Sequence, residues 1–383
     1  MKLPLTCSLI LGMGMATTQA ADPYISLKKE IEQAIARGNN WLLEQQKPEG
    51  HWDDPDLPAF TALALNAIVR DPNFDLNKKY PDEVEKGFQW LLDQQKEDGG
   101  IYNRGLGVYN TATSVTAMTA TGREDLEPSI VKGRAYLVRN QWDLGEKGKQ
   151  DNINDGGIGY GSDDSYSNLS TTYLAIEAIA LSEPIVSDGK YGDQPQLNYE
   201  AALTFLSRCQ NLEATNDQEW ANDSDPRIKG GVIYAPGQSK GEDLETKDGR
   251  VALRSYGSMT YAGMLSMIYA KVSPDDPRVI AIKEWLGHNY TLEENPGLGP
   301  QGLYYYFQAM SKALTAAQMD TLTLEDGTQI DWRRELGTKL LQLQREDGSW
   351  VNDNGRFMES NSVLVTAYSV LALEQLYDSF PKK

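Results

Sequence analysis

Two clusters of acidic residues are the groups in this chain whose types and spacing could move a proton. They occupy residues 53–56 (Asp-Asp-Pro-Asp) and 162–165 (Ser-Asp-Asp-Ser), in turns that lead into apolar segments. Neighbouring carboxylates can share a proton, which raises the pKa of one of them and suits it to acid catalysis. Asp163 and Asp164 are therefore the candidate proton donors. The alternative is that both clusters cap helix N-termini, where Asp and Ser are preferred.

Tyrosines are the second kind of residue that could take part in binding or chemistry. The chain contains 20 of them, and several begin apolar segments. A tyrosine ring can stack on an apolar chain or a sugar while its hydroxyl still forms a hydrogen bond. Packing between helices is the alternative for each one. We take the polar and aromatic residues at the starts of the apolar segments as candidate ligand-binding residues. These are Tyr166, Arg254, Tyr256, Tyr261, Tyr304, Tyr305, Glu359 and Asn361.

Nucleophiles and metal ligands are scarce by comparison. The histidines are His51 and His288, no Gly-x-Ser-x-Gly motif is present, and a serine hydrolase is therefore not expected. Residues 151–156 begin like a calcium loop, but Ile153 and Ser162 stand where such a loop needs oxygen ligands, so a solvated loop is expected. The sequence predicts no metal and no cofactor.

The elements that must position these residues form a repeat. Residues 37–52 and 86–102 share a basic residue, Gly, Trp-Leu, Gln and a final Gly-x-aromatic. Six copies align, each with Gln, or Tyr at 290, five positions after its first residue. They begin at Trp41, Trp90, Tyr136, Phe205, Trp285 and Lys339. Repeats of this length are typical of stacked or ring-shaped helical architectures.

Each copy has helical periodicity and is followed by a Gly-rich turn and a second, apolar segment rich in small residues, such as 60–68 and 364–373. A helix that is apolar on nearly every side must be enclosed by neighbours. Six hairpins with an exposed first helix and an enclosed second helix favour a closed ring, because neither terminal copy resembles the polar cap of an open solenoid. The open solenoid is the alternative.

The ends and the charge of the chain set its expected location and partners. Residues 1–21 read as a signal peptide, with Lys2, a short apolar run and cleavage after Ala20 or Ala21. We therefore expect export to the periplasm or the medium, with no transmembrane segment in the mature chain. The net charge of −19 disfavours nucleic acid as a partner. Residues 22–383 form one domain, with polar insertions near 143–165, 183–198 and 211–250.

The repeat resembles the Gln-Trp repeats of squalene-hopene and oxidosqualene cyclases and, more widely, the alpha/alpha toroid of protein prenyltransferase beta subunits. The resemblance spans about residues 31–377 and implies an all-α (alpha/alpha)6 toroid of six helix hairpins around a cavity that, in those relatives, binds isoprenoid chains. The Asp-x-Asp-Asp acid motif of the cyclases is absent. The zinc ligands of the prenyltransferases are also missing, since only His51, His288 and Cys209 could supply nitrogen or sulfur.

Three functions remain open from the sequence. An exported toroid that binds a ligand or a protein without chemistry, through its mouth and the acidic insertion 211–250, accounts for the missing motifs and is the main hypothesis. A terpene cyclase-like enzyme would act on an isoprenoid chain in the cavity, with Asp163 or Asp164 as the acid. A polysaccharide-active enzyme would bind a glycan in a cleft and cut it with paired carboxylates.

Overall fold

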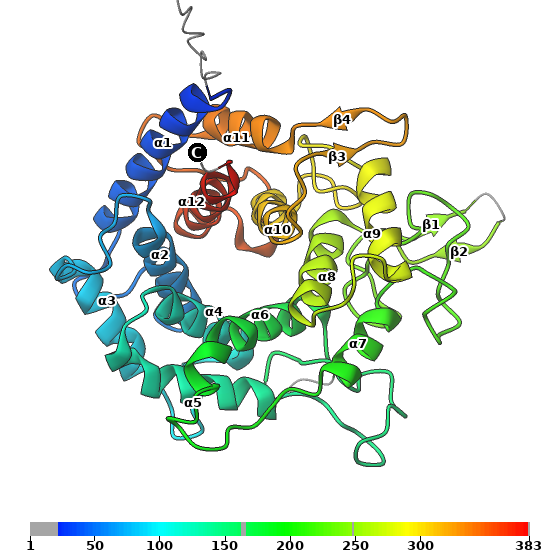
Figure 1. Cartoon of the computed structure of the whole chain (residues 1–383), viewed down its shortest axis with the longest axis horizontal. Helices are drawn as coiled ribbons and strands as arrows, with labels where there is room; N and C mark the ends of the chain where they lie inside the picture. Colours follow the sequence, from blue (N-terminus) through cyan, green and yellow to red (C-terminus); the bar gives the residue numbers. More distant parts are fainter. Residues whose placement is uncertain (1–21, 162–165, 247–248, 382–383) are drawn as a thin grey trace, which may run out of the picture.

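The computed structural model describes residues 22–161, 166–246 and 249–381. Helices alternate along these residues between an outer and an inner ring (Figure 1). The outer helices are α1 (Ile25–Glu44), α3 (Asp82–Asp93), α5 (Glu127–Arg139), α7 (Tyr199–Arg208), α9 (Pro277–His288) and α11 (Trp332–Leu343). The inner helices are α2 (Pro58–Arg70), α4 (Gly107–Ala120), α6 (Leu169–Val186), α8 (Gly257–Tyr269), α10 (Leu303–Ala316) and α12 (Ser362–Ser379).

The ring is closed. Each inner helix packs against the next, and α12 packs against α2, while α1 packs against α11 in the outer ring. The predicted all-α (alpha/alpha)6 toroid is therefore confirmed, and the open solenoid is excluded. Two antiparallel hairpins lie outside the ring: β1 (Leu244–Glu245) pairs with β2 (Val251–Ala252), and β3 (Leu322–Thr323) pairs with β4 (Gln329–Ile330). Two short 3-10 turns, η1 (Glu124–Leu126) and η2 (Arg356–Met358), complete the regular elements of the described residues.

The repeated glutamine joins neighbouring hairpins. Gln95 follows α3, and its Nε2 donates to the carbonyls of Gly99 in its own turn (3.0 Å) and Ser129 on the next outer helix (3.0 Å). The equivalents Gln46, Gln141, Gln210 and Gln344 make the same pair of bonds. Gln344 closes the ring, because its second acceptor is the carbonyl of Ala34 on α1 (2.9 Å). At the fifth position the hydroxyl of Tyr290 reaches Glu335 on α11 instead (2.7 Å).

The glycines of the turns are needed where the next outer helix approaches. Gly156 has φ +83°, and a Cβ there would lie 2.0 Å from the carbonyl oxygen of Ala201. Gly230 has φ +80°, and its Cβ would lie 2.2 Å from the carbonyl oxygen of Ala281. A side chain at either position would meet backbone that cannot move aside, so only glycine satisfies both the left-handed conformation and the contact.

Threonines connect five of the six turns to their inner helices. The backbone N–H that follows the glycine turn donates to a threonine hydroxyl on the inner helix, as from Trp52 to Thr61 (3.0 Å) and from Ile158 to Thr172 (2.8 Å). Thr111, Thr260 and Thr366 accept in the same way. The Thr-rich composition of the inner helices is explained by these bonds, because a buried N–H outside a helix needs an acceptor.

One inner helix also passes the length and composition test for a membrane span. Among the described residues, α6 contains an 18-residue window of mean hydropathy 1.2, of which 61% is buried within the ring. Its apolar character is that of a helix enclosed by α4, α8 and α5, and a core helix of a globular protein passes the same test.

Pro184 lies inside this helix, which reaches Val186 and so includes the first part of the predicted insertion 183–198.

The insertion 211–250 is partly packed, although the sequence predicts a loop excursion. Asn211 is buried and donates to the carbonyl of Leu253 and to the hydroxyl of Ser255, both at 2.9 Å. Its later part, from Tyr234 to Lys240, reaches the central cavity described below. The insertion thus forms part of the wall at one end of the ring.

Candidate functional site

A cavity of about 430 Å³ lies at the end of the ring where the inner helices begin. Seven tyrosines surround it: Tyr109, Tyr160, Tyr166, Tyr234, Tyr256, Tyr305 and Tyr368. Most of the remaining wall is apolar, from Leu57, Ala59, Phe60, Leu106, Met259, Leu298, Phe357, Met358 and Leu364. Ser170, Ser258, Gly302 and Lys240 complete the described lining, which contains no carboxylate. Such a cavity favours an apolar guest that forms a few hydrogen bonds to hydroxyls.

Three of the tyrosines form the floor of this cavity. Tyr109, Tyr305 and Tyr368 also border a much smaller space of about 20 Å³ on its far side. The hydroxyls of Tyr109 and Tyr368 lie 3.1 Å apart, and the ring centroids of Tyr305 and Tyr368 are 5.7 Å apart. Burial raises the pKa of Tyr109 to about 12 and raises the pKa of Tyr368 well above its ordinary value. The floor therefore presents neutral phenols, which can bind a polar group but do not act as bases near neutral pH.

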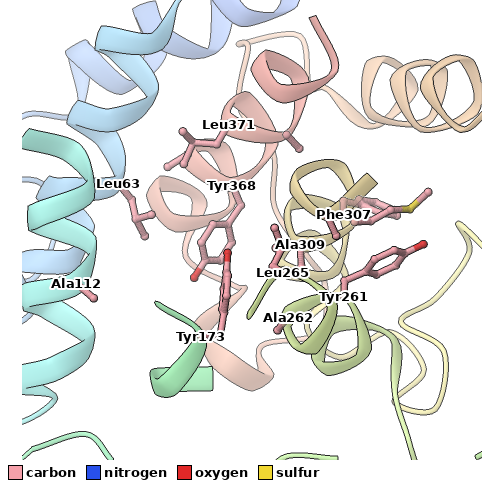
Figure 2. Close-up of a cluster of buried hydrophobic side chains, with 14 of the residues drawn as sticks. Leu63, Ala112, Tyr173, Tyr261, Ala262, Leu265, Phe307, Ala309, Tyr368 and Leu371 are labelled. Carbon is pink, nitrogen blue, oxygen red and sulfur yellow. The ribbon is translucent and has the colours of Figure 1, made fainter. Parts of the chain in front are cut away.

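A buried ion pair lies beyond the floor. Lys312 on α10 lies 2.7 Å from Glu177 on α6, and its Nζ also donates to the hydroxyl of Tyr173 (3.0 Å). Tyr269 on α8 donates to the same carboxylate at 3.2 Å. In the view of Figure 2, Tyr173 and Tyr368 both project toward the middle of the ring. The pair joins helices that are not neighbours in the ring, so it blocks the central axis and leaves the cavity open at one end.

The open end carries a strained apolar lip on η2. Phe357 and Met358 have φ +59° and +66°, a left-handed conformation that is uncommon for residues other than glycine. Both side chains line the cavity and yet remain exposed, at 43% and 45%. Backbone strain of this kind persists only where surrounding contacts hold it, and it is often found at ligand-binding sites.

Three of the eight predicted ligand-binding residues, Tyr166, Tyr256 and Tyr305, lie in the cavity wall. Tyr261 lies outside the wall and packs on Tyr306, with ring centroids 5.8 Å apart. Tyr304 also lies outside it, because its ring packs edge-on against Phe307. The run from Tyr304 to Phe307 thus turns one ring, that of Tyr305, toward the cavity.

The side chains of Glu359 and Asn361 form hydrogen bonds with backbone N–H groups and do not line the cavity. The buried carboxylate of Glu359 accepts hydrogen bonds from the N–H groups of Tyr304 (3.3 Å) and Tyr305 (2.8 Å) and from Asn352 Nδ2 (2.7 Å). Burial raises the pKa of Glu359, and these hydrogen bonds oppose the rise. The side chain therefore caps the start of α10.

Asn361 caps the start of α12. Its Oδ1 accepts from the N–H groups of Val363 (2.9 Å) and Leu364 (3.2 Å), and its Nδ2 donates to Asp53 (2.6 Å). The predicted capping of α2 by residues 53–56 is not seen, since the N-cap residue of α2 is Leu57 and Asn110 Oδ1 accepts from the N–H of Ala59 (3.0 Å).

Arg254 lies next to the mouth without entering the described lining. Its Cγ would lie 3.0 Å from a Cβ at Gly241, the residue after Lys240, and burial lowers its pKa. The candidate acids Asp163 and Asp164 lie outside the described residues. Tyr160 and Tyr166, which flank them in sequence, both line the cavity.

Sequence reasoning missed most of the cavity wall, including the polar residues Tyr109, Tyr234, Lys240 and Tyr368. Tyr109 and Tyr368 stand within small-residue inner helices, where a single large polar ring is an available signal of a position that faces the central axis. Tyr234 and Lys240 belong to the insertion, and no repeat or periodicity marks them. No group of three or more potential metal ligands is found in residues 22–161, 166–246 and 249–381.

Comparisons with solved structures agree with the fold. The type II terpene cyclase MstE from Scytonema matches with a TM-score of 0.53 and 13% identity over 92% of this chain and 99% of that chain. A family 76 glycoside hydrolase from a bovine Bacteroides thetaiotaomicron strain matches with a TM-score of 0.56 and 11% identity, over 91% of this chain and 78% of that chain. D-mannose isomerase matches with a TM-score of 0.57 and 12% identity, over 93% of this chain and 99% of that chain.

These neighbours share the alpha/alpha toroid, and at such identities the likeness concerns the fold. No protein-family model and no curated protein matches the sequence.

Proposed function

We propose that this protein binds an elongated apolar molecule of the isoprenoid class in the tyrosine-lined cavity, as an exported binding protein. The observation that carries the proposal is the cavity wall, which combines an apolar surface with neutral hydroxyls and, in the described residues, no carboxylate. Its volume of about 430 Å³ falls within the range of roughly 300–1,000 Å³ found for small-molecule sites. The terpene cyclase MstE, which has the same fold, has been solved with geranylgeranyl dihydroxybenzoate as its substrate.

A glycan is less well supported as the guest. Hydrolysis of a glycosidic bond needs two carboxylates across the scissile bond, and the described lining offers none. The floor of Tyr109, Tyr305 and Tyr368 also closes the cavity, so the middle of a long polysaccharide could not pass through it.

The first test is mass spectrometry of a solvent extract from the mature protein purified from its own host, which should contain a stoichiometric isoprenoid or related lipid. The second is titration of the emptied protein with geranylgeraniol. Ser170→Phe places a ring in the cavity and should abolish binding, whereas Ser187→Phe, at an exposed site past the end of the same helix, should not change it. An empty extract together with equal affinities for these two variants would refute the proposal.

Terpene cyclase-like catalysis is the second candidate function. The specific observation in its favour is the set of tyrosine rings around the cavity, because aromatic faces stabilise cations such as those formed in terpene cyclisation. Asp163 and Asp164 remain the candidate acids for this reaction. Incubation with geranylgeranyl dihydroxybenzoate should then give a cyclised product of unchanged mass, and Asp163→Asn with Asp164→Asn should abolish it. Turnover that survives both substitutions would remove them as acids.

Export and a protein partner belong to the same proposal. Cleavage after Ala20 or Ala21 should give a mature chain in the periplasm or medium, which N-terminal sequencing of the fractionated protein would establish. Retention of the leader in the cytoplasmic fraction would contradict export. A partner would contact the mouth, where the insertion 211–250 contributes Tyr234 and Lys240 to the wall.

A further inference from the structure

Lys240 is a lysine at the mouth of the cavity that has no carboxylate partner in the described part of the chain. Its ammonium lies 4.0 Å from the centroid of the Tyr234 ring, and no hydrogen bond or ion pair joins it to a described residue. The largely buried cations Lys312 and Arg208, by contrast, are paired with Glu177 and Asp217. In a chain with a net charge of −19, an unpaired ammonium in a cavity wall is a feature that requires an explanation.

The loop holds this ammonium in place. Ser239 Oγ donates to the carbonyl of Arg254 (2.5 Å) and accepts from the N–H of Gly241 (3.1 Å), so the residues on both sides of Lys240 are fixed. Gly241 lies so close to Gly297 that a Cβ on it would be 2.7 Å from the carbonyl oxygen. The charge is therefore held by the fold at the edge of the cavity, and a ligand need not order the loop around it.

Arg356 is a second cation next to Lys240. Arg356 Nη2 donates to the carbonyl of Lys240 (3.4 Å), and its Nη1 bonds to the side chain of Gln301. Burial and the positive charge of Arg356 both lower the pKa of Lys240. An anion bound between the ammonium and the cavity would offset both effects, because it replaces lost solvation and opposes the repulsion.

We propose that the guest is an apolar chain that ends in a carboxylate, and that Lys240 binds this carboxylate at the mouth while the chain lies among the tyrosine and leucine side chains below. This inference rests on the proposed binding function and names its ligand class. A singly charged carboxylate matches the one ammonium that lies in the cavity wall, and the positive charge of Arg356, which the neutral side chain of Gln301 does not cancel, further favours an anion there. Tyr234, under the ammonium, gives it an aromatic face that a desolvated cation prefers.

The experiment compares three probes with one chain: farnesol, farnesoic acid and farnesyl monophosphate, each titrated into the emptied protein. The wild-type protein should bind farnesoic acid about tenfold or more tightly than farnesol, since a hydrogen bond to a charged group is worth at least that factor. Lys240→Met should bind the acid no more tightly than the alcohol. Lys229→Met removes an exposed lysine of the same insertion and should keep the preference.

The possible failures are distinguishable. Equal binding of acid and alcohol by the wild-type protein would overturn the carboxylate assignment while leaving an apolar binding site intact. A preference for the acid that persists in Lys240→Met would overturn the role of that lysine. Tighter binding of the monophosphate than of the acid would replace the carboxylate with a phosphate. Binding of none of the three probes would overturn both this inference and the proposed function.

Discussion

Replacing Gln210 with leucine should destabilise the ring by about 3 kcal/mol, since leaving a buried carbonyl without a donor costs about 1–3 kcal/mol and a second lost bond adds about 1 kcal/mol. Gln210 is 1% exposed, and its Nε2 donates to the carbonyls of Gly230 (2.9 Å) and Arg278 (3.0 Å). Leucine has nearly the same volume, so no cavity is created and the loss is that of the bonds.

The assay is urea unfolding followed by circular dichroism and by tryptophan fluorescence. Both probes must give the same midpoint before a free energy of unfolding is assigned, because a chain of this size can unfold through intermediates. The matched control is Gln46→Leu. Gln46 bonds to the carbonyls of Gly50 (2.9 Å) and Glu83 (2.8 Å) in the same way but is only half-buried, so water can replace the lost donor.

We expect a loss of about 1 kcal/mol or less for Gln46→Leu, as for a hydrogen bond that water can replace. Equal losses for the two variants would show that burial does not set the value of the repeated glutamine. A loss below about 0.5 kcal/mol for Gln210→Leu would refute the reasoning altogether, because such a bond would then contribute less than the usual minimum.

Phe357→Gly should raise the free energy of unfolding by about 1 kcal/mol or leave it unchanged, because glycine adopts φ +59° without strain. The same variant should bind geranylgeraniol more weakly, because it loses a side chain that lines the cavity. Clear destabilisation in urea would contradict the first expectation. Lys312→Met should cost about 3–5 kcal/mol, because Glu177 is then buried without a counter-charge, and the double variant Lys312→Met with Glu177→Gln should cost less; equal losses in urea unfolding would argue against the pair.

Glu374→Gln should flatten the pH dependence of stability. Both carboxylate oxygens of Glu374 lack a described hydrogen-bond partner, and the nearest cation, Arg70 Nε, is 3.9 Å away. Burial raises the pKa of Glu374 well above its ordinary value, so the native protein retains a proton that the unfolded chain releases, and stability falls as pH rises above about 4.3. Unfolding of wild type and variant from pH 4 to 8 checks this, and parallel curves would contradict it.

The architecture could be predicted because its determinants recur. Gln46, Gln95 and the other repeat glutamines donate to backbone carbonyls at the same positions of their hairpins, and the turn glycines allow the same close approach of the next outer helix. These requirements leave the same residue types at matching positions in five of the six hairpins, which one sequence is enough to reveal. The closure of the ring also followed, since neither terminal hairpin carries a polar face.

The cavity could be predicted only in part, because its residues are not repeated. Tyr256 and Tyr305 were found because they begin inner helices, but the same criterion also selected Glu359 and Asn361, whose side chains cap helices instead. A polar residue at a helix start can serve either the backbone or the site, and its sequence position is the same in both cases. The position of Lys240 could not be predicted from the sequence, because the path of the insertion, and not any periodicity, brings this residue to the mouth.

The residues that line the cavity also limit which group could donate a proton to a bound molecule. Glu359 is a buried carboxylate near the mouth, and burial raises its pKa, but it does not line the cavity and its oxygens accept bonds from the N–H groups of Tyr304 and Tyr305 and from Asn352. The floor tyrosines are weaker acids than free phenol, because burial raises the pKa of Tyr109 to about 12. Protonation of an alkene or epoxide therefore has no donor among the described cavity residues. The proposal of catalysis therefore depends on Asp163 or Asp164, whereas the proposal of binding does not.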